Sequence, residues 1–135
     1  MDLTKDRAQD QARAKLDSII EMMRALETGE EIDGEDAHDR IQEDPLSVEV
    51  RSDWHSPGDG NDKPAVYEIL LCTGGSAVKI TGELNEYCEP ETAQIEYQDW
   101  GTYWKRYTDT NSAEDEVLLD YAQQFYYGGG SRRFR

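Results

Sequence analysis

The sequence has few of the residues that build common catalytic and metal centres. Its 135 residues include two cysteines and two histidines. Cys72 and Cys88 are too widely spaced to form a close metal-binding or redox motif, which favours thiols kept reduced in a cytosol. No phosphate-binding loop, nucleophile elbow or His-Glu-x-x-His helix is present. The sequence therefore predicts a non-enzymatic protein without a cofactor or a metal.

Long apolar runs and a secretory leader are also missing. The chain begins MDLTKDRAQDQARAK, which is polar and mixed in charge, whereas a signal peptide carries a basic region followed by an apolar run. No apolar stretch approaches the roughly 20 residues that a membrane-spanning helix needs. These features predict a soluble intracellular protein.

Positive charge is scarce as well. The chain has 14 Lys and Arg residues against 30 Asp and Glu residues, which gives a formal net charge of -16. Such a charge repels nucleic acid and anionic membranes and attracts basic surfaces, most strongly at low salt. We therefore expect a basic protein partner, with no direct binding to nucleic acid or membrane. High solubility or adaptation to a salty cytoplasm would explain the same composition.

The negative charge is most concentrated in the segment GEEIDGEDAHDRIQEDP, residues 29–45, which has eight carboxylates and one arginine. An EF-hand loop beginning at Asp33 would place Ala37 at a ligand position and His38 at the required glycine, so the calcium motif does not fit. We interpret the segment as a partner-binding surface, although a solvated acidic face gives the same pattern. The candidate residues are Glu30, Glu31, Asp33, Glu35, Asp36, Asp39, Glu43 and Asp44.

Two weaker chemical alternatives remain open. Asp59, Asn61 and Asp62 could hold a hard cation, but a turn favours the same residue types. An enzyme would need a cleft in which His38 or His55 meets carboxylates, or a pair of carboxylates for glycoside hydrolysis.

The periodicity of apolar residues predicts an α+β domain. An amphipathic helix is expected over residues 4–27, ended by Gly29, and a shorter acidic helix is expected to begin at Asp33 or Asp36 and to end near Glu43. Alternating segments around residues 46–51, 65–73, 77–84 and 92–100 predict a four-stranded antiparallel meander, the last strand continuing irregularly through GTYWKRY. A C-terminal helix capped by Ser112, with Asp115 completing a capping box, is expected to end at Gly128–Gly130. Residues 1–128 would form one domain, and residues 129–135 a flexible basic tail.

Aromatic residues cluster in YQDWGTYWKRY, residues 97–107. Trp and Tyr are enriched at the energetic centres of protein interfaces, but they also fill cores. Trp100 and Trp104 are therefore second candidates for partner binding.

Four segments resemble a family of small acidic proteins of unassigned function from phages and integrated mobile elements of bacteria. The similarity extends over about residues 40–128 and contains no catalytic motif. The segments are RIQEDPLSVEVRSDWHSPG, EILLCTGGSAVKITGEL, IEYQDWGTYWKRY and LLDYAQQFYYGG.

The resemblance implies a setting in the cytoplasm of a bacterial host cell, where small proteins of this kind often disarm CRISPR or restriction systems. A helix rises about 1.5 Å per residue, close to the roughly 1.7 Å per charge of duplex DNA. We therefore expect an anti-defence inhibitor whose acidic face mimics DNA and binds the basic nucleic-acid surface of a host nuclease complex. The alternative is a structural or assembly factor of the mobile element that uses its aromatic residues or forms a homodimer.

Overall fold

The computed structural model describes residues 3–52, 57 and 64–128 of the chain. The expected basic tail and the candidate residues His55, Asp59, Asn61 and Asp62 lie outside the described residues. In chain order the elements are α1 (Leu3–Thr28), β1 (Glu31–Ile32), β2 (Glu35–Asp36), α2 (Ala37–Glu43), β3 (Ser47–Ser52), β4 (Pro64–Cys72), β5 (Ser76–Glu83), β6 (Gln94–Asp99), β7 (Lys105–Arg106) and α3 (Ser112–Ala122).

The α+β class is confirmed, but the main sheet has five antiparallel strands, in the order β3-β4-β5-β6-β7, where four were predicted. The additional strand is β7, which folds back onto β6 and pairs Lys105 with Tyr97. The reversal occurs at Gly101, whose φ of 75° suits a tight turn. A hydrogen bond of 3.0 Å from the Thr102 amide to the Asp99 carbonyl closes this turn.

A second difference lies within the acidic segment, where β1 and β2 form a separate two-stranded sheet. Asp33 and Gly34 join these strands with φ angles of 51° and 82°. Two consecutive residues with positive φ form the hairpin turn whose twist matches that of paired strands, and Asp-Gly is a preferred sequence for it. The acidic segment is therefore only partly helical, because its first part turns back on itself before α2 begins.

Helix α1 is the central element of the core. Its residues Ala12, Leu16 and Ile19 are buried at the predicted three- and four-residue spacing. As predicted, Gly29 ends the helix, with a φ of 79°. The Glu30 amide donates a 3.0 Å hydrogen bond to the Ala25 carbonyl, which is the bond expected of a Schellman cap.

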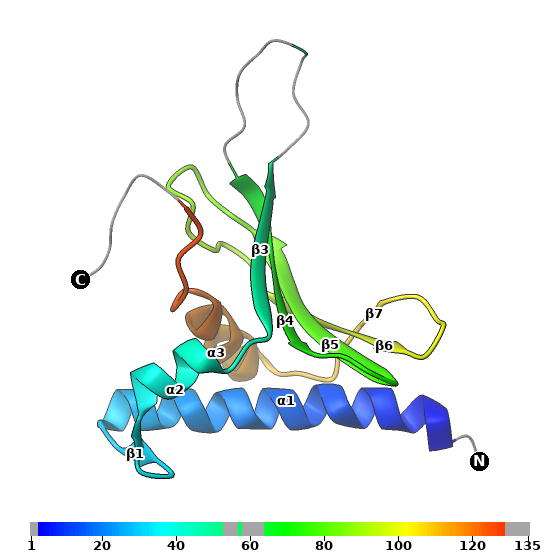
Figure 1. Cartoon of the computed structure of the whole chain (residues 1–135), viewed down its shortest axis with the longest axis horizontal. Helices are drawn as coiled ribbons and strands as arrows, with labels where there is room; N and C mark the ends of the chain where they lie inside the picture. The colour runs from blue at the N-terminus through cyan, green and yellow to red at the C-terminus, as the bar shows by residue number, and fades with distance from the viewer. Residues whose placement is uncertain (1–2, 53–56, 58–63, 129–135) are drawn as a thin grey trace.

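Helix α1 packs against α2, α3, β5 and β6, and α3 also packs against β6. In Figure 1, α1 runs along the bottom of the view, and α2 and α3 lie above it to the left of the sheet. Tyr67 and Ile69 of β4, Ile80 of β5 and Ile95 of β6 are buried in the shared core with α1 and α3.

Strand β3 is less buried than its alternating pattern predicted. Val48 is half-buried, whereas Val50 is 43% exposed and Leu46, directly before the strand, is 61% exposed. The reason is position: β3 is an edge strand, paired only with β4, whereas α1 packs on β5 and β6 and α3 packs on β6. Apolar side chains on β3 therefore extend beyond the helical layer.

The cap of α3 lies one residue before the predicted position. Asn111 is the N-cap, and its side chain and that of Glu114 form a reciprocal capping box, where Ser112 and Asp115 were expected. The helix ends at Ala122 rather than continuing to Gly128. The Tyr127 hydroxyl donates a 2.6 Å hydrogen bond to the Ala122 carbonyl, which satisfies one of the free acceptors at the helix end.

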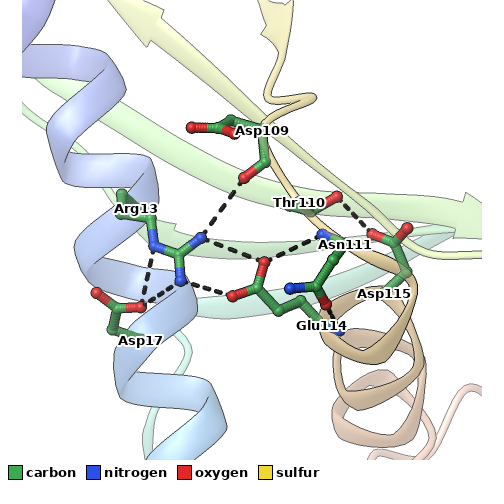
Figure 2. A network of polar contacts seen from close by, with 7 residues as sticks. All are labelled: Arg13, Asp17, Asp109, Thr110, Asn111, Glu114 and Asp115. Atoms are coloured by element: carbon green, nitrogen blue, oxygen red, sulfur yellow. Dashed lines mark hydrogen bonds and ion pairs between the residues drawn. The ribbon is translucent and has the colours of Figure 1, made fainter.

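An arginine joins α1 to the start of α3 (Figure 2). Arg13 forms an ion pair of 2.7 Å with Glu114 and one of 2.8 Å with Asp17. These two carboxylates raise the pKa of Arg13, and in turn the arginine lowers the pKa of Glu114. Because Glu114 also closes the capping box, this single side chain fixes both the start of α3 and its contact with α1.

Candidate partner-binding surface

The acidic segment folds because three apolar residues are spaced among its carboxylates. Ala37 and Ile41 of α2 are buried, and Ile32 of β1 packs against the core. Ala37 and Ile41 lie four residues apart, on one face of α2. Burial of these side chains holds the hairpin and α2 beside α1, so the segment is a structured surface. We call residues 30–44 the acidic hairpin–helix.

Most of the predicted carboxylates lie on the exposed side of the acidic hairpin–helix. Glu35 and Asp44 are half-buried. The exposed residues are Glu30, Glu31, Asp33, Asp36, Asp39 and Glu43.

Within the described part of the chain, direct ion pairs with lysine or arginine do not neutralise the negative charge of this surface. Over the described residues, the only ion pair within 4.0 Å that involves one of the eight carboxylates joins His38 to Asp39 at 3.9 Å. A hydrogen bond between the carboxyl groups of Glu35 and Glu43 raises the pKa of Glu35. The Glu43 carboxylate thus lies close enough to Glu35 to disfavour the ionised form of Glu35.

Basic side chains do border this surface. A shallow pocket of about 400 Å³ lies between α1 and β1 and includes Arg24 and Arg40 together with Glu30, Glu31 and Asp33. Arg40 is half-buried and acts on Glu35 by lowering its pKa, against the larger effect of Glu43. On the side that faces α1, the area lined only by acidic side chains therefore ends at this pocket, where Arg24 and Arg40 lie.

Two of the predicted residues also have structural roles. Asp36 caps α2, and its carboxylate accepts a 3.3 Å hydrogen bond from the Asp39 amide. Asp33 occupies the positive-φ position of the hairpin turn. Replacement of either residue would alter the backbone as well as the charge, so binding experiments should use other carboxylates.

Asp44 is the clearest case of a predicted binding residue that holds the fold together. Its carboxylate accepts a 2.6 Å hydrogen bond from the Tyr121 hydroxyl of α3. Tyr121 is fully buried, and this burial raises the pKa of its hydroxyl. The pair fixes the end of α2 against α3, at a sequence separation of 77 residues.

Substitution Asp44→Ala is therefore expected to lower the free energy of unfolding by about 1–3 kcal/mol, because it leaves the buried Tyr121 hydroxyl without its partner. Tyr121→Phe removes the donor and should cost less. The double mutant should be no less stable than Asp44→Ala alone, as measured by urea unfolding. Additive losses would show that the two side chains do not interact.

The carboxylates Asp36 and Asp39 and the His38 ring place their ligand atoms within 4.8 Å of one another. All three are exposed. The Asp36 carboxylate is already engaged with the Asp39 amide, so the grouping follows from the cap at the start of α2. His38 thus meets carboxylates on the open surface of the acidic hairpin–helix.

The predicted match between the rise of a helix and the charge spacing of duplex DNA applies to only a small part of the acidic segment. Within the eight candidates, only Asp39 and Glu43 lie inside α2. The carboxylates before α2 are on or beside a hairpin, where the rise per residue is more than twice that of a helix and the chain reverses. The charge is therefore spread over a patch and does not follow one helical line.

The aromatic candidates lie apart from the acidic ones. Trp100 is 79% exposed at the turn between β6 and β7, and Tyr103 nearby is 87% exposed. Trp104 is half-buried, with the Lys79 ammonium 4.1 Å from its ring centre. In Figure 1 the β6–β7 turn lies at the right of the molecule, whereas β1 lies at the lower left. The predicted partner-binding residues thus form two separate surfaces.

Sequence reasoning missed a polar cluster on the face of the sheet that turns away from the core. Lys79 lies 3.2 Å from Glu68 and 3.9 Å from Glu96, on neighbouring strands. These residues line a groove of about 640 Å³, which also includes Glu49 and Arg51 of β3. The alternation of Glu68 and Lys79 with buried residues was a signal for this face, but their pairing depends on the register of the sheet.

No family model, curated protein or solved structure matches this chain. The resemblance to phage and mobile-element proteins therefore stays a prediction. Over the described residues, every helix is too short or too polar to cross a membrane.

Proposed function

We propose that this protein is a non-enzymatic inhibitor of bacterial defence that binds the basic nucleic-acid surface of a CRISPR or restriction nuclease complex through its acidic hairpin–helix. The observation that supports the proposal is the combination of exposure and order in this segment. Its exposed carboxylates lack direct lysine and arginine partners among the described residues, and buried Ile41 and Ala37 hold them on a folded base. A folded surface loses little conformational entropy on binding.

A patch of carboxylates can compete with DNA without copying the form of a helix. A nuclease cleft attracts phosphates through lysine and arginine side chains, which respond to carboxylates by the same Coulomb attraction. The formal net charge of -16 adds a long-range attraction that raises the association rate at low salt. Binding should therefore weaken as salt increases, as DNA binding to the same cleft does.

The proposal is tested by capturing partners from a bacterial host lysate at low and moderate salt. Recovery of a nuclease or DNA-surveillance subunit that is released by added duplex DNA would support it. Recovery of a partner that is indifferent to DNA and salt would contradict it.

The second candidate function, an assembly factor of a mobile element, is favoured by the β6–β7 turn. Four hydrogen bonds that involve side chains of Gln98, Asp99 and Thr102 fix this turn, which presents Trp100 to solvent. Under this alternative, Trp100→Ala abolishes partner capture and charge reversal on the acidic hairpin–helix leaves it intact.

A further inference from the structure

The exposed edge of β3 has the features of a self-pairing strand. β3 extends without interruption from Ser47 to Ser52. Its pairing with β4 shifts register between Arg51 and Ser52, and the additional residue at this shift belongs to β4. The sheet ends at β3, and the helices that contact the sheet, α1 and α3, pack on β5 and β6, so the outer backbone edge of β3 is unpaired in the described chain. The other edge strand, β7, has only two residues. An unpaired edge of this length can add a further strand.

The side chains of β3 distinguish the partners that would fit this edge. Glu49 and Arg51 are exposed and point to the same face of the sheet, with the exposed Val50 between them on the other face. Among the described residues, neither Glu49 nor Arg51 takes part in an ion pair. Glu49 lies directly opposite Glu68 of β4, and like charges in this arrangement are destabilising. A strand that fits this edge would therefore place a positive charge opposite Glu49 and a negative charge opposite Arg51.

We propose that the partner of this edge is a second copy of the chain, joined by antiparallel pairing of the two β3 strands around a twofold axis at Val50. A twofold axis perpendicular to a continuous sheet pairs residues that point to the same face. If the axis passes through Val50, Glu49 of each copy lies opposite Arg51 of the other. The two Val50 side chains then face each other, and Val48 faces Ser52.

Other registers fit less well. An axis at Glu49 uses the strand equally fully but places Glu49 opposite Glu49, where the charges repel. An axis at Arg51 places two arginines opposite each other, and an axis at Val48 leaves Val50, Arg51 and Ser52 without partners inside the strand. Charge and strand length thus select one register. Because the strand is short, the dimer is expected to be a weak one.

The inference is independent of the proposed function, because β3 lies outside the acidic hairpin–helix. Its test is sedimentation velocity across a wide concentration range that extends to millimolar protein. Physiological salt should be used, because it screens the repulsion between two copies that each carry a charge of -16. Wild type should form dimers at the higher concentrations. The single variants Glu49→Arg and Arg51→Glu should dimerise at least about tenfold more weakly, because each places two pairs of like charges in contact.

When mixed, the two single variants should restore each other's dimerisation. A mixture of Glu49→Arg and Arg51→Glu should form a heterodimer, since each arginine of the first variant then faces a glutamate of the second. The double variant Glu49→Arg/Arg51→Glu should dimerise like wild type. Thermal unfolding of each variant checks that its fold is retained. Monomeric wild type at every concentration, or single variants that dimerise like wild type, would overturn the proposal, as would a mixture that remains monomeric.

Discussion

Substitution Gly82→Ala is expected to lower the free energy of unfolding by about 2–4 kcal/mol and the melting temperature by roughly 10 °C. Gly82 of β5 pairs with Tyr67 of β4, whose ring lies against it. A Cβ atom at this position would be 2.7 Å from the Tyr67 ring and closer still to the Thr92 carbonyl oxygen. The constraint is space, because Gly82 does not have a positive φ.

The cost extends beyond one contact because Tyr67 connects three parts of the fold. Its hydroxyl donates a 2.6 Å hydrogen bond to the Thr92 carbonyl, and its ring centre is 5.1 Å from that of Tyr127. Moving the ring to admit a methyl group would break the hydrogen bond and disturb the packing after α3. Both effects act on the folded state only.

Gly75→Ala is the matched control for this prediction. Gly75 lies in the β4–β5 turn and has no positive φ, and a Cβ atom added there would meet no heavy atom within 4 Å. The change should alter the free energy of unfolding by less than about 0.5–1 kcal/mol. Thermal and urea unfolding of both variants provide the measurement. Equal stability of the two variants would mean that β5 does not pass so closely beneath Tyr67.

The second large effect is on binding. Simultaneous reversal of Glu31, Asp39 and Glu43 to lysine is expected to weaken partner binding by about 100-fold or more, while the fold is retained. A surface charge contributes about 0.5 kcal/mol to an ion pair and reversal doubles the loss, so three reversals amount to about 3 kcal/mol. Asp36, Asp33 and Asp44 are left unchanged because they cap α2, form the hairpin turn and hold Tyr121.

A matched control reverses three exposed glutamates elsewhere, Glu83, Glu86 and Glu91. The change in net charge is the same, and these residues lie beside the start of β4, since the Glu91 amide bonds to the Glu83 carbonyl and the Leu84 amide bonds to the Ala65 carbonyl. The acidic hairpin–helix lies at the other end of the sheet, where α2 leads into β3. The control should bind with nearly wild-type affinity. An equal loss in both variants would assign binding to net charge alone, and no loss in the first would exclude the acidic hairpin–helix.

The sequence predicted best those elements whose hydrophobic pattern extends over many residues. Leu16 and Ile19 lie in a helical period that extends over many turns, and α1 was found within one residue of its predicted bounds. Strands β1, β2 and β7 were missed because two-residue strands have no measurable alternation. They form because the turns at Asp33–Gly34 and at Trp100–Gly101 bring their ends together. In such cases turn geometry decides the structure and hydrophobic pattern does not.

The sequence predicted which segment carries the candidate site but not how its side chains are arranged in space. Local composition identified the acidic residues, and burial of Ile41 explains why they are ordered. The structural role of Asp44 depends on Tyr121, which is distant in sequence, and no local pattern contains that information. In the same way, the separation of Trp100 from the carboxylates follows from the position of the β6–β7 turn, which is set by the strand order.

The most direct test of the proposed function is a titration of the captured host complex with this protein in the presence of increasing duplex DNA. Competition for one basic cleft predicts that the apparent dissociation constant rises linearly with DNA concentration. The reversal of Glu31, Asp39 and Glu43 should raise this constant by about 100-fold or more at every DNA concentration. An affinity that is independent of DNA, with wild type and the reversal variant bound equally, would contradict the proposal.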